Sequence, residues 1–215
     1  MIRMIGDVHG HIEIYNEIIK DCDYSIQLGD FGFKNEIKQL KYVNSQKHKI
    51  VAGNHDDYDH LSDHYMGDFG VHSFGDFEFF FIRGAYSIDQ KRRIVSGSYW
   101  TNEELDYHQV NKMITEYEKI NPQIVISHDC PLEIISFVGS HHYQLSWTNK
   151  FLSHIFNLNN PAVWFFGHHH MNKIIHFRNT YFIYLGELQF VDWSSGDSIG
   201  KNVDRIKNDS FFAFS

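Results

Sequence analysis

The sequence contains 16 histidines, and five of them stand with aspartate and asparagine in short clusters that could do chemistry. Each cluster follows a short apolar run that we expect to be a buried strand. In chain order the clusters are Asp7 with His9, Asp30, Asn54 with His55 and Asp56, His128, and His168 with His170. One such residue after a strand is ordinarily a turn or capping residue. Five clusters in equivalent positions indicate a shared site.

The donor atoms of these clusters are carboxylate and amide oxygens and imidazole nitrogens, without a thiolate. Such donors suit Mn, Fe, Zn, Ni or Co, and they do not suit an iron-sulfur cluster. The clusters hold more donors than one ion needs. They would serve two ions roughly 3.5 to 4 Å apart that share a bridging carboxylate, an arrangement suited to in-line displacement at phosphorus.

Strands and helices that alternate along the chain would bring these clusters together. The strands are predicted at residues 2–5, 25–28, 50–52, 124–126 and 162–166. Helical spacing of apolar residues separates the first strands from one another, and this β-α-β order predicts a largely parallel sheet. Because ligands bind beyond the carboxyl ends of parallel strands, we expect the five clusters at one edge of one sheet.

The middle and the end of the chain have a different pattern. Two hairpins are predicted, at residues 71–82 and 173–185, because a two-residue turn separates β-type runs in each. A helix is expected over residues 105–120, after a helix start at Thr101. No repeat or proline-rich linker interrupts the chain, so we interpret residues 1–215 as a single domain.

Composition excludes several classes of protein. The 215 residues include 19 Lys and Arg against 27 Asp and Glu, which gives a net charge of −8 at pH 7. This acidic balance argues against a stable complex with nucleic acid. Cys22 and Cys130 are too few for a disulfide framework, and no apolar run is long enough to span a membrane. We therefore expect a cytoplasmic protein without a membrane partner.

Taken together, the five clusters resemble the signature of the calcineurin-like metallophosphoesterase superfamily. That signature reads Asp-x-His, Gly-Asp, Gly-Asn-His-Asp/Glu, His and Gly-His-x-His. The corresponding blocks of this sequence are Asp7-Val8-His9, Gly29-Asp30, Gly53-Asn54-His55-Asp56, His128 and Gly167-His168-His169-His170. The resemblance implies an α/β fold in which two mixed β-sheets flanked by helices form a four-layer αββα sandwich.

The resemblance also implies two divalent metal ions, with Mn²⁺ expected and Fe, Zn, Ni or Co as alternatives. One ion would be held by Asp7, His9, Asp30 and His170, and the other by Asp30, Asn54, His128 and His168. Asp30 would bridge the two ions. The implied reaction is hydrolysis of a phosphate ester by in-line attack of a metal-bridging hydroxide.

Other histidines near this centre are assigned different roles. The resemblance implies that His55, as imidazolium, stabilises or protonates the leaving group, and that Asp56 orients the His55 ring and keeps it charged. His169 stands between two implied ligands and is expected to point away from the ions if the segment is extended. His141 and His142 are interpreted as residues of a solvated loop.

A second, more local resemblance, to phage and bacterial metallophosphatases, begins at Gly84-Ala85-Tyr86-Ser87-Ile88-Asp89. In those proteins an arginine follows this segment, and Arg92 or Arg93 stands in its place. A guanidinium group binds two phosphate oxygens at once, so either arginine could bind the substrate. The alternative is an ion pair between Asp89 and one of these arginines that holds the loop.

Three functions fit these motifs. The leading one is a metal-dependent phosphoesterase that acts on a small or flexible phosphate ester. The second is a phosphodiesterase or nuclease that acts on cyclic nucleotides or nucleic-acid ends. The third is a non-catalytic scaffold of the same fold, like the retromer subunit of this superfamily. A protein Ser/Thr phosphatase is disfavoured because the two arginines that mark that class are missing, one of them at Ala52.

Overall fold

The computed structural model describes residues 1–138, 145–208 and 212–213. Its strands are β1 Ile2–Ile5, β2 Tyr24–Gln27, β3 His48–Ile50, β4 Phe69–Phe74, β5 Phe77–Ile82, β6 Ile124–Ser127, β7 Val163–Phe166, β8 Lys173–Phe177, β9 Thr180–Tyr184, β10 Gln189–Trp193 and β11 Phe212–Ala213. Its helices are α1 Ile12–Ile19, α2 Lys34–Ile37, the 3₁₀ helix η1 Lys38–Tyr42, α3 Gln90–Ser96, α4 Tyr107–Ile120, α5 Leu132–Val138, α6 Trp147–Leu158 and α7 Ile199–Asn208.

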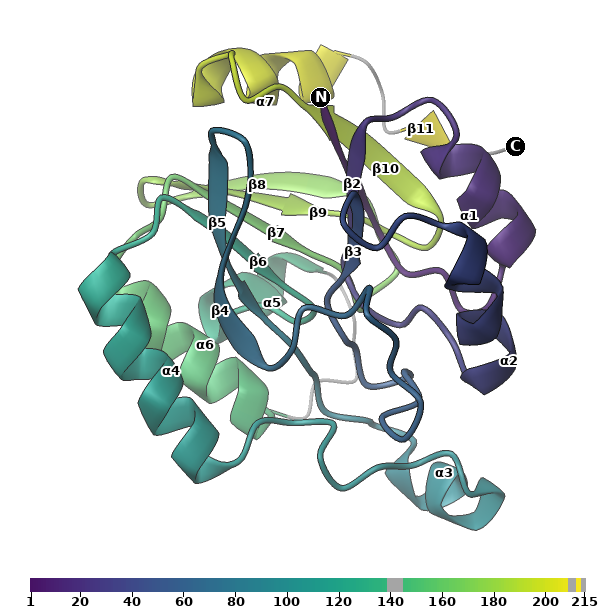
Figure 1. Ribbon diagram of the computed structural model, residues 1–215. Coiled ribbons are helices and arrows are strands. Elements are labelled where there is room, and N and C mark those ends of the chain that lie inside the picture. Colours follow the sequence, from purple (N-terminus) through teal and green to yellow (C-terminus); the bar gives the residue numbers. More distant parts are fainter. Residues whose placement is uncertain (139–144, 209–211, 214–215) are drawn as a thin grey trace.

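The strands form two mixed sheets (Figure 1), one in the order β11-β10-β1-β2-β3 and the other in the order β4-β5-β6-β7-β9-β8. The helices α1 and α2 flank the first sheet, whereas α4 and α6 flank the second. This arrangement confirms the two-sheet sandwich that the family resemblance implied. The expectation of one sheet was wrong, because β1, β2 and β3 belong to the first sheet and β6 and β7 to the second.

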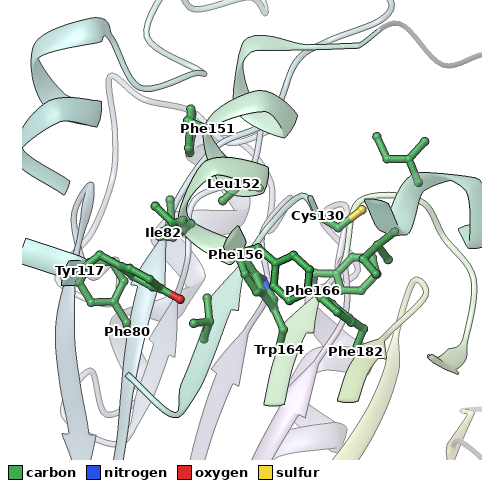
Figure 2. Close-up of a cluster of buried hydrophobic side chains, with 14 of the residues drawn as sticks. Phe80, Ile82, Tyr117, Cys130, Phe151, Leu152, Phe156, Trp164, Phe166 and Phe182 are labelled. Carbon is green, nitrogen blue, oxygen red and sulfur yellow. The ribbon is translucent and has the colours of Figure 1, made fainter. Parts of the chain in front are cut away.

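Alternating side chains along the strands build the layers of this sandwich. In β7, Val163 and Phe165 pack in the core between the two sheets, and Trp164 and Phe166 pack on the opposite face, against the outer helices. Figure 2 shows Trp164 and Phe166 in that outer cluster, with Phe182 beside them. Because strand side chains point alternately to either face, an unbroken apolar run fills both cores at once.

The carboxyl ends of β1, β2, β6 and β7 meet at one end of the sandwich, and hydrogen bonds join the loops that follow them. His128 Nδ1, after β6, lies 2.7 Å from the carbonyl oxygen of Leu28, after β2. The main-chain N–H of His168, after β7, donates to Asp7 Oδ1, after β1, at 3.0 Å. These bonds tie the polar clusters of the two sheets into one region.

The helix predicted after Thr101 begins later, because Asp106 is the N-cap of α4 and accepts a hydrogen bond from the Gln109 N–H at 2.8 Å.

A helix that spans a membrane must be both long and apolar, and none of the helices in the described part of the chain meets this requirement.

Candidate metal centre

A cavity of about 430 Å³ lies where the loops after the strands meet. Its lining includes six residues of the predicted clusters, namely His9, Asp30, Asn54, His55, His168 and His170. Asp7 and His128 are fully buried, and each lies within about 3.2 Å of one of these lining residues. The structure therefore brings all seven predicted metal ligands together.

The first group of ligand atoms comes from Asp7, His9 and His170, whose donor atoms lie within 4.8 Å of one another. Asp7 Oδ2 is 3.1 Å from His170 Nε2 and 3.8 Å from His9 Nε2. The two Nε2 atoms of His9 and His170 are 3.0 Å apart. A carboxylate oxygen and two imidazole nitrogens thus converge on one point.

The second group comes from Asp30, His128 and His168, with the same spacing of donor atoms. His128 Nε2 lies 3.2 Å from Asp30 Oδ1 and 3.2 Å from Asn54 Oδ1. Because His128 Nδ1 faces the carbonyl of Leu28, the proton of a neutral His128 ring belongs on Nδ1. The Nε2 lone pair then faces the Asp30 and Asn54 oxygens, as a metal ligand requires.

Asp30 stands between the two groups. Its Oδ1 faces His128 and accepts a hydrogen bond from the His55 main-chain N–H at 2.7 Å. Its Oδ2 lies 3.9 Å from His9 Nε2, on the side of the first group. One carboxylate therefore presents an oxygen to each group, which is the geometry of a bridging ligand.

The backbone at the site is unusual in two respects. Four predicted ligands have φ in the left-handed region, at 45° for His9, 58° for Asp30, 69° for His168 and 54° for His170. A Cβ on Gly53 would lie 2.2 Å from Asp30 Oδ1, closer than any side chain allows. The glycine of the Gly-Asn-His-Asp block is therefore required by the close approach of a ligand.

The donor set fits a divalent cation. Asp7 Oδ2 is buried and has no hydrogen-bond donor of acceptable geometry among the described residues. The pair of Nε2 atoms at 3.0 Å also needs a proton or a cation between them, because two lone pairs repel. A buried acceptor without a donor costs free energy. A cation bound by Asp7, His9 and His170 would remove both deficits.

Electrostatics at the second group are consistent with this fit. Burial lowers the pKa of His168 to about 3, so its ring is neutral and able to bind a metal. Burial also opposes protonation of His128, but the charge of Asp30 raises the pKa of that ring to about 10. A cation beside Asp30 would therefore compete with a proton on His128.

The side chains of His55 and Asp56 have different surroundings in the structure. The His55 ring lines the cavity, and its centroid lies 5.6 Å from that of His9. Burial lowers the pKa of His55, which opposes the imidazolium form that the resemblance implied. In the described part of the chain, the Asp56 carboxylate makes no hydrogen bond to the His55 ring. It accepts instead from the main-chain N–H groups of Phe31 at 2.8 Å and Gly53 at 2.7 Å and from the Tyr65 hydroxyl. The expected orienting role of Asp56 was wrong; Asp56 holds two ligand-bearing loops together.

Neither predicted substrate arginine lines the cavity. The side chain of Arg92 is 82 % exposed and pairs with Asp89 at 3.1 Å, which is the loop-holding alternative. Arg93 is buried and pairs with Glu103 at 2.7 Å. The expectation that one of these guanidinium groups binds substrate oxygens is therefore not met by the observed geometry.

Sequence reasoning missed a polar pair on the cavity wall. His169 lines the cavity and belongs to neither of the first two ligand groups, and its Nε2 lies 3.0 Å from Oδ1 of the buried Asp129. Asp129, His168 and His169 form a third group of donor atoms within 4.8 Å. The position of Asp129 directly after His128 was the available signal. His141 and His142 lie outside the described residues.

Several solved structures are similar to this chain at low sequence identity. A phosphopantetheinyl hydrolase from Mycobacterium tuberculosis has 14% identity and a TM-score of 0.48, with 86% of this chain and 90% of that chain covered. A predicted phosphoesterase from Streptococcus pneumoniae has 13% identity and a TM-score of 0.42, with coverage of 88% and 79%. Vps29 from Chaetomium thermophilum has 12% identity and a TM-score of 0.43, with coverage of 90% and 82%.

Comparison at the level of families gives a clear match. No curated protein matches the chain. The sequence profile of the calcineurin-like phosphoesterase superfamily domain matches residues 1–200, which include all five polar clusters. The chain therefore belongs to the calcineurin-like phosphoesterase superfamily.

Proposed function

We propose that this protein is a metal-dependent phosphoesterase with a dinuclear centre. One divalent cation, with Mn²⁺ as the expected metal, would be held by Asp7, His9, Asp30 and His170, and the other by Asp30, Asn54, His128 and His168. The observation that carries the proposal is the position of Asp30, which presents Oδ1 to His128 and Oδ2 to His9. Two bound cations supply neutralisation of phosphate oxygens and a water of lowered pKa.

The residues of the chain have separate tasks in this reaction. Asp30 is fixed by the His55 main-chain N–H, so its two oxygens keep their directions. The His55 side chain lines the cavity without belonging to either ligand group. It would donate a hydrogen bond to the leaving oxygen of the substrate, where a proton must arrive when the P–O bond breaks.

The cavity lining supports a restricted class of substrate. Beside the ligands, its described part contains the apolar side chains of Ile88 and Ile135 and the polar side chains of Ser146 and Asn149, without a lysine or arginine. A second phosphate group would find no lysine or arginine in this described lining, and the carboxylates of Asp89 and Asp129 there would repel it. The expected substrate therefore carries one phosphate on an uncharged leaving group.

Phosphodiesters are the second candidate substrates. A diester phosphate carries a single negative charge, and the described lining offers no lysine or arginine for further negative charge. This favours small diesters, including cyclic nucleotides, over polyphosphates. A stable complex with long nucleic acid is not expected from a chain of net charge −8.

A panel of substrates tests the proposal. The purified protein is stripped with a chelator, reloaded with Mn, Ni, Zn, Fe or Mg, and assayed on an alkyl monoester, an alkyl diester and a cyclic dinucleotide. Metal-dependent turnover of any of these supports the proposal, and turnover of diesters alone assigns the second candidate. A protein that takes up no metal and hydrolyses none of the panel is a scaffold, and the proposal fails.

A further inference from the structure

A buried hydrogen-bond network lies behind the predicted ligand Asn54. Asn54 Nδ2 donates to Ser87 Oγ at 3.0 Å, and Ser87 Oγ donates to Glu103 Oε2 at 2.6 Å. Arg93 donates to the same Ser87 oxygen and pairs with Glu103 Oε1 at 2.7 Å. These four residues are only 2 to 3 % exposed. Water therefore has little access to replace any of these bonds.

The donors and acceptors of this network have only one consistent arrangement. Glu103 faces donors alone, because its Oε1 accepts from Arg93 and from the Trp100 main-chain N–H at 3.2 Å. The single hydroxyl proton of Ser87 is therefore directed to Glu103, and its lone pairs remain for Arg93 and Asn54. Only the NH₂ group of Asn54 can face such an oxygen. The amide oxygen of Asn54 is thereby turned toward His128, 3.2 Å from its Nε2.

We propose that Ser87, with its hydroxyl proton directed by Glu103 and Arg93, is a positioning residue that presents Asn54 Oδ1 to the metal of the second ligand group. This role rests on the proposed dinuclear function. It gives the segment from Gly84 to Glu103 a task that does not require contact with the substrate. A side-chain amide that could rotate would offer the cation its oxygen only part of the time, and the network removes that freedom.

Removal of the Ser87 hydroxyl is the first test. Titration of the stripped protein with Mn²⁺ in a calorimeter should show two sites, and Ser87→Ala should weaken one of them by about 10- to 100-fold. The site formed with Asp7 should keep its affinity. Ser87→Thr, which keeps a hydroxyl group, should restore most of the lost affinity.

Ser153→Ala is the matched control. Ser153 is also buried, donates to Glu133 Oε2 at 2.7 Å and accepts from the Leu132 N–H at 2.8 Å. Its removal costs a comparable set of hydrogen bonds away from the site, so both Mn²⁺ affinities should stay unchanged. Equal Mn²⁺ titrations for Ser87→Ala, Ser153→Ala and the wild type would overturn the positioning role.

Reversal of the network is the second test, and it uses isosteric changes. Asn54→Asp removes the donor that faces Ser87, and Glu103→Gln supplies a new donor on the opposite side. The Ser87 proton can then turn toward residue 54, so the double variant should bind Mn²⁺ at least about tenfold more tightly than the two single effects predict. Most of this coupling should disappear when Ser87→Ala is added, because the proposed coupling passes through the hydroxyl. A coupling caused by direct charge repulsion between residues 54 and 103 would persist.

The outcomes separate the two proposals. A wild type that binds no Mn²⁺ overturns the proposed function and the positioning role with it. A wild type that binds two ions, with additive effects of Asn54→Asp and Glu103→Gln, overturns the positioning role alone. Coupling that persists in the Ser87→Ala background also overturns it, because the effect then passes directly between residues 54 and 103.

Discussion

His55 is the side chain whose removal should separate metal binding from turnover. It lines the cavity but belongs to neither ligand group. We expect His55→Ala to keep both metal ions and to lower kcat by about 10²- to 10⁴-fold on an alkyl phosphate, whose leaving oxygen needs a proton. The loss should be much smaller on a nitrophenyl phosphate. Metal content and kcat on the two substrates check this, and an unchanged kcat on the alkyl phosphate would refute the role of His55.

Gly53 should tolerate no side chain at all. A Cβ at this position would lie 2.2 Å from Asp30 Oδ1 and 2.7 Å from His128 Nε2. We expect Gly53→Ala to destabilise the fold by at least about 1 to 3 kcal/mol and to abolish Mn²⁺ binding, because two predicted ligands must move. Urea unfolding and Mn²⁺ titration measure both effects. Gly196→Ala, where a Cβ meets nothing within 4 Å, should change neither.

Residue types were more predictable than residue partners. The seven predicted metal ligands lie together because each follows a strand that its apolar pattern reveals. The roles of Asp56 and Arg93 were not predictable in the same way. Both side chains are buried against groups in other segments of the chain. The Asp56 carboxylate accepts from the main-chain N–H of Phe31, and Arg93 pairs with Glu103. A motif identifies a side chain, but packing decides what that side chain contacts.

At the scale of elements, the start of α4 offers a direct test. Asp106 accepts from the Gln109 N–H, and the Gln109 side chain accepts from the Asp106 N–H at 2.8 Å. We expect Asp106→Ala to lower the free energy of unfolding by about 1 kcal/mol, the usual cost of losing an N-cap. Thr101→Ala, at the start that the sequence suggested, should have little effect in the same urea titration. The reverse order of the two effects would contradict the observed cap.

Elements with local signals were predicted, and elements that depend on distant partners were not. The strand at residues 2–5 and the hairpin of β4 and β5 follow from apolar alternation and a two-residue turn. The helix α5 was missed because Leu132–Val138 is only seven residues long and five of these residues are apolar, so its helical period is weak. The strand β10 was missed because it is defined by antiparallel pairing with β1, at the opposite end of the chain.

At the scale of the whole molecule, histidines outside the site should make the fold sensitive to acid. His48 and His64 are buried, and burial lowers the pKa of both below the ordinary value of 6.5. Unfolding restores their ordinary pKa, so both histidines bind protons more readily in the unfolded chain. The contribution of these two histidines to the free energy of unfolding should therefore fall as the pH drops below about 6.5, by at most about 1.4 kcal/mol per pH unit for each group.

Urea unfolding of the chelator-stripped protein between pH 5 and pH 8 measures this slope. Stripping removes the contribution of metal binding, which also varies with pH. The slope should become smaller in His64→Gln, while the exposed His154→Gln serves as the control. Equal slopes for the wild type and His64→Gln would show that burial of His64 does not contribute to the pH dependence.

The left-handed backbone at His9, His168 and His170 has a consequence for engineering. Each such histidine costs about 1 kcal/mol relative to a residue at ease in that conformation, such as glycine. Selection of variants for heat resistance alone, without metal or substrate, would favour glycine at these three positions. Variants selected in this way would be more stable but would lack three predicted metal ligands, so a library needs a metal-binding assay alongside the thermal one.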